Sequence, residues 1–285
     1  MLKIVVTGCN GQLGRAVIEE FNKCKNYEIL GLDSKSLDIS KEDTIAKLKS
    51  INPDAIVNCA AFTKVDDSEE NIDRAYRVNT IGARNLAVAS NECNAKLVHI
   101  STDYVFDGSK RTPYTEFDDP NPQGTYARTK YEGEKLVREF SDKFFVFRTS
   151  GLYGEGQNFV RTMLEKSKIE REIAVVSDQI ATPTSAIELV RCISNMLPTD
   201  NYGIFPATCE GECSWADFAK EIFSIVQEPI KINRINSSEY GSNVKRPKYS
   251  VLENQMLKLT HGYIFPDWQD ALRNYLENGG LSGKQ

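Results

Sequence analysis

The sequence predicts an α/β protein, with a doubly wound parallel sheet in the first half and a smaller C-terminal α/β cap. Short β-branched apolar runs alternate with amphipathic helical segments up to about residue 150. This alternation is typical of a parallel sheet with right-handed crossovers and helices on both faces. Beyond residue 150 the alternation loosens and prolines interrupt the chain. With 285 residues, the chain can form one large domain or two modest ones that share a cleft.

The first half contains five apolar runs with strand character and four segments with helical periodicity. We expect strands at residues 2–8, 27–33, 54–61, 96–102 and 144–150. We expect helices at residues 12–24, 41–51, 71–93 and from Tyr126 to about Phe140. Leu13, Val17 and Phe21 share one face of the first helix, and Ser40 is a candidate N-cap for the second.

The second half is expected to lie over the carboxyl edge of the sheet. Helical segments are expected at residues 158–168, 185–197, 215–226 and 268–278, and the tail 278–285 is expected to fray. We therefore divide the chain into a cofactor-binding domain at 1–150 and a mainly substrate-binding domain at 151–285. Some segments of the second domain are expected to return to the sheet.

Composition and charge narrow the class of protein. The formal net charge is −5, and no long basic run points to nucleic acid. No segment approaches the ~20 apolar residues of a membrane span, and the N-terminal apolar run is too short for a signal peptide. Seven scattered cysteines and two histidines do not form a zinc pattern. We expect a cytoplasmic protein with no metal site.

Three glycines follow the first expected strand and open the first expected helix. Gly8, Gly11 and Gly14 have the spacing G-x-x-G-x-x-G, one residue off the G-x-G-x-x-G fingerprint of dinucleotide binding. Glycines in this place let backbone N–H groups approach a pyrophosphate at a helix N-terminus. Asn10, Gln12 and Leu13 in the same turn are candidate cofactor contacts. An ordinary tight βα loop is the alternative.

An acidic residue ends the second expected strand. Asp33 lies 19 positions after Gly14, close to the ~20-residue offset at which an acid reaches the adenosine ribose. A carboxylate there repels a 2′-phosphate and favours NADH, whereas Lys35 offsets that repulsion. Asp38 and Ile39 form a second candidate for the adenine end. A turn aspartate is the alternative interpretation of Asp33, so NADH and NADPH both stay open.

A hydroxyl and a Tyr-x-x-x-Lys pair follow the fourth expected strand. Thr102 lies at the carboxyl end of that strand, and Tyr126 and Lys130 share one face of the next helix. A lysine cation lowers the pKa of a nearby phenol, which then serves as a general acid. The pair alone is weak evidence, because this spacing also arises by chance. Its place after a glycine turn favours catalysis.

Motifs along nearly the whole chain carry a family resemblance. They are TGCNGQLG (7–14), NCAAFTKVDDSE (58–69), VNTIGARNLA (78–87), STDYVFDG (101–108), YARTKYEGE (126–134), FRTSGLYG (147–154), DQIATPTSA (178–186), CSWADFA (213–219), KRPKYSVL (245–252) and WQDAL (268–272). The sequence resembles the extended short-chain dehydrogenase/reductases, which have a Rossmann-type fold. Within them it is similar to the dTDP-4-dehydrorhamnose reductase family.

The resemblance implies a reaction and its residues. NADPH or NADH would reduce the C4 ketone of dTDP-4-dehydro-6-deoxy-L-mannose, giving dTDP-L-rhamnose. Tyr126 would protonate the sugar oxygen, Thr102 would hydrogen-bond it, and Lys130 would hold the nicotinamide ribose and tune Tyr126. The remaining implied contacts are Ala60, Ala61 and Thr63 for the cofactor, and Tyr104, Asn158 and Arg246 for the sugar and diphosphate.

The three substrate candidates each have a structural alternative. Tyr104 could pack in the core, Asn158 could cap the helix that follows it, and Arg246 could be a surface cation. Asp66, Asp67, Ser68 and Glu69 form an acidic cluster typical of a solvated helix start.

Two positions depart from the family pattern. Gly151 stands where the family usually carries a tryptophan beside the sugar, and Ala181 stands where glycine is common. The first departure keeps a related dTDP-4-keto-6-deoxy sugar open as the substrate. A non-catalytic subunit, similar to the regulatory subunit of methionine adenosyltransferase, is the alternative from another class. We expect a monomer or a homodimer.

Overall fold

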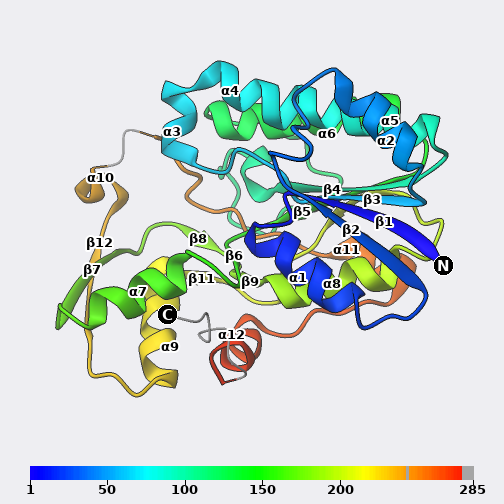
Figure 1. Ribbon diagram of the computed structural model, residues 1–285. Helices are drawn as coiled ribbons and strands as arrows, with labels where there is room; N and C mark the ends of the chain where they lie inside the picture. Colours follow the sequence, from blue (N-terminus) through cyan, green and yellow to red (C-terminus); the bar gives the residue numbers. More distant parts are fainter. Residues whose placement is uncertain (242–243, 278–285) are drawn as a thin grey trace.

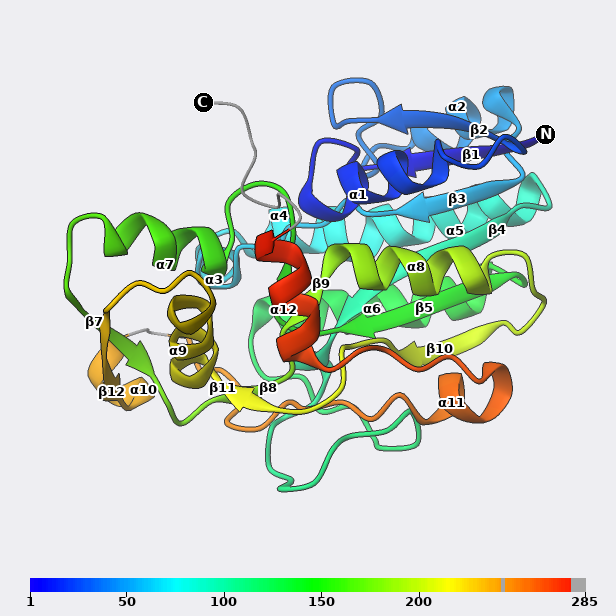
Figure 2. The same cartoon turned by 90° about the horizontal axis from the view of Figure 1, so that it is seen from below.

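A computed structural model describes residues 1–241 and 244–277 of the chain. Its centre is a six-stranded, wholly parallel sheet in the order β10-β5-β4-β3-β1-β2 (Figures 1 and 2). The strands are β1 (Leu2–Thr7), β2 (Tyr27–Leu32), β3 (Ala55–Asn58), β4 (Lys96–Thr102), β5 (Phe144–Thr149) and β10 (Gly203–Pro206). The expected doubly wound, Rossmann-type sheet is confirmed, with β10 as a sixth strand supplied by the second half.

Helices cover both faces of this sheet, as Figure 1 shows. One face carries α1 (Gln12–Phe21), α8 (Ala186–Met196) and α11 (Gln255–His261); the other carries α2 (Asp43–Ile51), α5 (Gly82–Glu92) and α6 (Thr125–Phe140). Side chains of a strand point alternately to opposite faces. Ile4 and Val6 of β1 accordingly pack in the core beside α1 and α8, whereas Val5 packs beside α2 and α5. The sheet is therefore buried on both faces.

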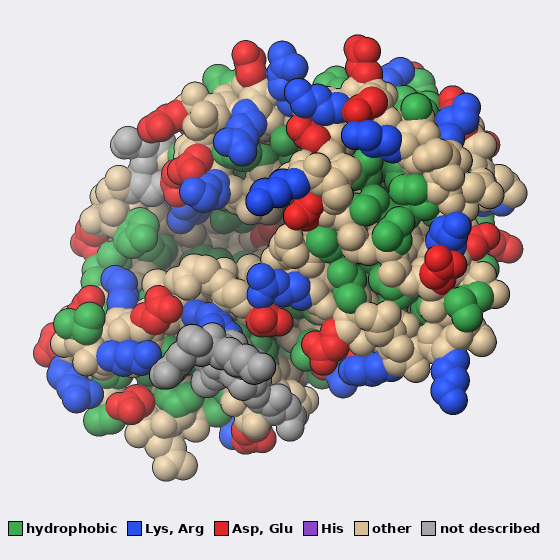
Figure 3. Space-filling view, in the orientation of Figure 1, with side chains coloured by type: hydrophobic (Ala, Val, Ile, Leu, Met, Phe, Trp, Pro, Cys, Tyr) green, Lys and Arg blue, Asp and Glu red, His purple; other side chains and the backbone are tan. Residues whose placement is uncertain are grey.

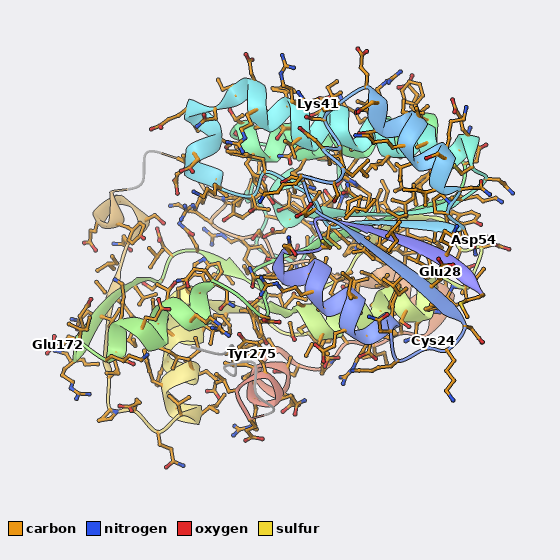
Figure 4. All side chains as sticks on the ribbon, viewed as in Figure 1. Cys24, Glu28, Lys41, Asp54, Glu172 and Tyr275 are labelled. Atoms are coloured by element: carbon orange, nitrogen blue, oxygen red, sulfur yellow. The ribbon has the colours of Figure 1, made fainter. Side chains whose placement is uncertain are left out.

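The second half builds a smaller lobe at the carboxyl edge of the sheet (Figure 2). It contains α7 (Phe159–Ser167), β7 (Glu172–Val176), α9 (Trp215–Ile225), β12 (Lys231–Ile235), α10 (Ser237–Tyr240) and α12 (Trp268–Glu277). Phe218 and Trp268 lie in its separate hydrophobic core. In Figure 4, Tyr275 of α12 lies where the lobe meets the sheet, and its hydroxyl donates a hydrogen bond to the Gly154 carbonyl at 2.8 Å.

Short strand pairs connect the lobe to the sheet. β6 (Leu152–Tyr153) pairs with β9 (Thr184–Ser185), and β8 (Ile180–Ala181) pairs with β11 (Cys213–Ser214). Within the described parts of the chain, no helix is long and apolar enough to cross a membrane.

The expected helices differ from the structure in two details. The helix expected at 71–93 is present from 72 to 92, but it contains a π-helical turn: α4 (Ile72–Tyr76), η1 (Arg77–Ile81) and α5 follow one another without a gap, and a separate helix, α3 (Val65–Glu70), precedes them. The π-turn places the Asn79 carbonyl against Gly133 of α6, where an added Cβ would come within 2.3 Å of it. Ser40 does not cap α2, because its hydroxyl bonds the Asp38 carboxylate at 2.7 Å and Glu42 occupies the N-cap position.

The strand order places a ligand site at one point of the sheet edge. β1 lies between β2 and β3, so the chain leaves β1 toward one side and returns on the other. Ligands of open α/β sheets bind at such a switch point, outside the carboxyl ends of the strands. Thr7 at the end of β1 pairs in register with Asn58 at the end of β3, and their side chains share a hydrogen bond of 2.7 Å.

Candidate active site

The turn after β1 requires glycine at two positions. Gly8 has φ +62°, and a Cβ there would lie 2.7 Å from the backbone nitrogen of Ala60. A Cβ at Gly14 would lie 2.3 Å from the carbonyl oxygen of Gly8. Gly11 occupies the N-cap of α1 without a side-chain cap, so the first-turn N–H groups have no cap from that residue. The turn is therefore shaped like an anion cradle at a helix N-terminus.

A cavity of about 580 Å³ opens beside this turn. Most residues predicted for the cofactor and for catalysis line it: Asn10, Gly11, Gln12, Leu13, Ala60, Ala61, Thr63, Thr102, Tyr126 and Lys130. Figure 3 shows the surface hollowed between the sheet and the smaller lobe. Thr149 also lines the cavity, and its buried hydroxyl has no hydrogen-bond partner among the described residues. The cavity therefore offers a backbone cradle and a free hydroxyl to a polar ligand.

The residues predicted for the adenine end do not line this cavity. Asp33 accepts hydrogen bonds from the backbone N–H groups of Lys35 and Ser36, and also from the Asn10 side chain at 3.3 Å. The bonds from Ser36 are the main reason that the pKa of Asp33 is lowered. Ile39 is buried in the core, and the Asp38 carboxylate accepts from Ser40. Asp33 is thus a turn aspartate whose second oxygen faces the glycine turn.

Tyr126 lies in the first turn of α6, at the boundary of two cavities. The N-cap residue of the helix is Gly124, which has no side chain to cap the first turn. A residue that is distant in the sequence takes over this role. The Glu69 carboxylate accepts from the Thr125 backbone N–H at 2.6 Å and from its hydroxyl at 2.7 Å. The acidic cluster at 66–69 therefore includes a residue that fixes the start of the Tyr126 helix.

Burial dominates the acidity of the Tyr126 phenol. It raises the pKa to about 12, while a hydrogen bond with Thr102 lowers it and the charge of Asp103 raises it. The expected lowering by Lys130 is not seen; the Lys130 ammonium donates a hydrogen bond to the Ile100 carbonyl at 2.5 Å. The phenol is protonated at neutral pH, which is the form that a proton donor needs.

Lys130 is a buried cation with a shifted pKa. Burial lowers its pKa to about 8, and the negative charge of Glu134 opposes that change. Glu134 follows one turn later on the same face of α6 and forms an ion pair with Arg148 of β5 at 2.7 Å. Ser101 also donates a hydrogen bond to Glu134. The sequence pattern missed this network, although Tyr126, Lys130 and Glu134 recur at intervals of four.

A second buried carboxylate lies beside the Thr102 hydroxyl. Asp103 accepts from Thr102 at 3.0 Å and from Ser150 at 2.8 Å. Burial raises its pKa to about 6. The backbone N–H of Tyr104 donates to Thr102 at 3.2 Å, so the Thr102 oxygen is held from two sides.

A smaller cavity of about 240 Å³ adjoins the first. The two share Thr63, Thr102, Asp103, Tyr126 and Gly151 as lining residues. Tyr104 lines the smaller cavity, with its ring edge-on to Tyr126 at a centroid distance of 6.1 Å. The two chambers share Tyr126 as a lining residue and together give space for two adjacent ligands.

The other two substrate candidates lie outside both chambers. Arg246 pairs with Asp66 at 2.6 Å and lines a third cavity with Lys245 and Lys248. Gln179 belongs to both the second and the third cavity, so these two adjoin.

Asn158 is the N-cap of α7. Its carbonyl oxygen accepts from the Arg161 N–H at 3.2 Å, and its amide donates to the Gly154 carbonyl at 2.6 Å and to Gln12 at 3.2 Å. The structure therefore gives Asn158 the helix-capping position and connects it with the cavity through Gln12.

Comparisons with known proteins agree with this geometry. A family model described as RmlD substrate binding domain matches residues 2–280. The chain is 37% identical over 288 residues to a dTDP-4-dehydrorhamnose reductase of Aggregatibacter actinomycetemcomitans, covering 96% of this chain and 98% of that protein.

Two crystal structures have closely similar folds. One is a dTDP-4-dehydrorhamnose reductase from Clostridium acetobutylicum ATCC 824, with a TM-score of 0.95, 45% identity, and coverage of 97% of this chain and 99% of that one. The other is dTDP-4-dehydrorhamnose reductase from Bacillus anthracis in complex with NADP, with a TM-score of 0.95, 42% identity and the same coverage.

Proposed function

The chain belongs to the RmlD substrate binding domain family, and we propose that it is an NAD(P)H-dependent dTDP-4-dehydrorhamnose reductase. The reaction is the reduction of the C4 ketone of dTDP-4-dehydro-6-deoxy-L-mannose to dTDP-L-rhamnose. One observation carries the proposal: Thr102, Tyr126 and Lys130 line the same cavity as the glycine turn. A hydroxyl donor, a protonated phenol and a cation beside a dinucleotide cradle are the parts of a carbonyl reductase.

The residues of the first cavity fit a nicotinamide dinucleotide. The α1 N-terminus and the turn at Gly8, Gly11 and Gly14 suit the pyrophosphate, because backbone N–H groups there bind anions. Ala60, Ala61 and Thr63 would contact the middle of the cofactor, and Thr149 offers its unpaired hydroxyl. Lys130 would hold the nicotinamide ribose. A bound reduced nicotinamide supplies the hydride for the ketone carbon.

Tyr126 is the proton donor for the sugar oxygen. Its pKa of about 12 keeps the phenol protonated until the oxygen of the ketone gains negative charge. Lys130 does not lower the pKa of Tyr126 in the structure, so its proposed part is to hold the nicotinamide ribose. Thr102 would donate a hydrogen bond to the same sugar oxygen, and its hydroxyl would then give up the hydrogen bond that it donates to Asp103.

The substrate would extend from the second cavity into the third. The sugar would lie beside Tyr104 and Tyr126 in the smaller chamber, close to Thr102. The diphosphate would follow toward Arg246, Lys245 and Lys248, whose positive charges suit phosphate oxygens. Asn158 would act indirectly, by positioning Gln12 of the glycine turn. In this arrangement residues 1–150 would bind the cofactor, and residues 151–285 would supply most of the contacts with the substrate.

A related dTDP-4-keto-6-deoxy sugar is the second candidate substrate. Gly151 supports it, because the wall of the sugar chamber at this position has no side chain. The non-catalytic alternative is less well supported, since all three catalytic candidates are present and line one cavity.

Loss of reduced-nicotinamide absorbance in the presence of the 4-keto sugar nucleotide tests the proposal. We expect turnover with the rhamnose precursor, and NADPH and NADH are compared in the same assay. Absence of turnover with either cofactor and any dTDP-4-keto-6-deoxy sugar contradicts it.

We further propose that the enzyme works in the cytoplasm as a monomer or a homodimer. The seven free cysteines support a reducing compartment. Light scattering coupled to size-exclusion chromatography determines the assembly, and a larger oligomer contradicts this part of the proposal.

A further inference from the structure

Gly151 leaves a side-chain-free position on the boundary of the two chambers. Its φ of +53° is a backbone conformation that other residues adopt with strain. A Cβ built there would lie 3.1 Å from the Cα of Pro183 and 3.5 Å from Cη2 of Trp215. The space beside Gly151 is thus bounded by an indole that arrives from a distant part of the chain.

Trp215 is held rigidly at that place. It is the first residue of α9, and the preceding Ser214 caps the helix through a reciprocal capping box with Asp217. Ser214 also pairs with Ile180 in the short antiparallel strands β8 and β11. The indole packs against Phe159 at a centroid distance of 4.8 Å, on the side of the lobe core. Both its backbone and its ring are therefore fixed.

The indole lines the smaller chamber together with Thr102, Tyr104 and Tyr126. Much of the remaining lining is polar, with Asp103, Ser150, Gln179 and Ser250 among its members. An aromatic face next to hydroxyl and carboxyl groups suits a ring that has both an apolar C–H face and polar edges. A 6-deoxy-hexose has both, because its methyl group and axial hydrogens are apolar and its hydroxyls are polar.

We infer that Trp215 is the aromatic wall of the sugar subsite and determines which 4-keto-6-deoxy sugar is accepted. The inference rests on the proposed function and adds a specificity residue to it. Its alternative is that Trp215 only packs the lobe core with Phe159 and Phe218, which the experiment must distinguish.

Binding of two ligands, one with the sugar and one without it, tests the inference. Calorimetry measures Kd for dTDP-L-rhamnose and for dTDP with the unaltered protein, Trp215→Leu and Trp215→Phe. We expect Trp215→Leu to weaken the binding of dTDP-L-rhamnose by about tenfold to a hundredfold, as for the loss of a buried aromatic contact. The binding of dTDP should weaken by less than about twofold. Trp215→Phe should lie between the two. If the variants bind both ligands as well as the unaltered protein does, or lose affinity equally for both, the inference is overturned.

A matched variant controls for packing. Phe159→Leu removes the ring that touches Trp215 inside the lobe and does not line either chamber. We expect it to change both affinities by less than about twofold, because leucine keeps an apolar contact with the indole and the capping box at Ser214 still holds the Trp215 backbone. If Phe159→Leu reproduces the selective loss of dTDP-L-rhamnose, Trp215 acts through packing and the inference is overturned.

Fluorescence gives a second readout that needs no change at Trp215. The chain has two tryptophans, and the second one, Trp268, is buried in the lobe core. In Trp268→Phe, Trp215 is therefore the one remaining tryptophan of the sequence. We expect dTDP-L-rhamnose to change the emission of this variant and dTDP to leave it nearly unchanged. Equal responses overturn the inference, even if Trp215→Leu does not fold. If neither ligand binds the unaltered protein, the proposed function fails and the inference fails with it. If the unaltered protein turns over the 4-keto sugar but the Trp215 variants lose no selective affinity for dTDP-L-rhamnose, the inference is overturned and the proposed function stands.

Discussion

The carboxylate of Glu134 and the guanidinium of Arg148 form a 2.7 Å ion pair, with side chains only 1% and 3% exposed. The pair joins α6, the helix that carries Tyr126 and Lys130, to β5 of the sheet. It stabilises the helix that carries both proposed catalytic residues, and the negative charge of Glu134 raises the pKa of Lys130 against the larger lowering by burial. Both effects have measurable consequences.

Glu134→Ala should strongly destabilise the protein. Removal of one partner leaves the Arg148 cation buried without its ion pair, which costs about 3–5 kcal/mol of unfolding free energy. Urea unfolding measures the change. Glu132→Ala is the matched control on the same helix, because Glu132 pairs with Lys135 on the surface and such pairs contribute ~0–1 kcal/mol. Similar losses in the two variants would contradict the assigned role of the pair.

Glu134→Gln should move the alkaline limb of kcat/KM to lower pH. Lys130 is charged below its pKa of about 8 and neutral above it, so activity should fall as the pH rises through that value. Because the Glu134 charge raises this pKa, an uncharged isostere lowers it. The pH dependence of kcat/KM for the sugar nucleotide measures the limb. Glu132→Gln should leave the limb in place, and a shift to higher pH in Glu134→Gln would be inconsistent with this coupling.

Glu69→Ala should reduce kcat without weakening the binding of the cofactor. The variant removes two hydrogen bonds to Thr125, at 2.6 and 2.7 Å, and so loosens the turn that presents Tyr126. Loss of a charged cap costs about 0.5–2 kcal/mol. Steady-state kinetics and NADPH titration separate the two effects, with Glu70→Ala as an exposed neighbouring control. An unchanged kcat would show that this cap does not position Tyr126.

Asp33→Asn should shift the cofactor preference toward NADPH. The amide keeps an oxygen for the N–H groups of Lys35 and Ser36 and removes the charge that repels a 2′-phosphate. We expect the ratio of kcat/KM for NADPH and NADH to rise by roughly threefold to tenfold at low salt, and by less at high salt. A ratio that does not change with the substitution would place Asp33 away from the adenosine ribose.

The repeating pattern of the first half predicted most of the fold. Strand β1 is a short β-branched apolar run and the helix that follows it has a 3.6-residue period, and local sequence determines both signals. β10 is four residues long and pairs with β5, which lies more than fifty positions earlier, so its place depends on tertiary contact. The π-turn η1 also depends on tertiary contacts, since the Asn79 side chain forms hydrogen bonds with the Phe62 backbone and with the Thr129 hydroxyl.

The chemistry of the site was predictable where it depends on neighbours in sequence. Tyr126 and Lys130 share a helix face, and Gly8 and Gly14 share a turn. The partners that hold the site in place come from other elements: Arg148 from β5, Glu69 from α3 and Trp215 from α9. Asp33 shows what spacing alone does not reveal. Its distance from Gly14 in the sequence suits an acid that binds the ribose, but its carboxylate also accepts hydrogen bonds within its own turn.

Tyr126→Phe tests the central claim most directly, since it removes only the hydroxyl that would protonate the sugar oxygen. Single-turnover oxidation of NADPH with the dTDP-4-keto sugar should slow by about 10²–10⁴-fold, the usual contribution of a general acid, while the Kd of NADPH changes by less than about twofold. Undiminished turnover in Tyr126→Phe would contradict the assignment of this phenol as the proton donor.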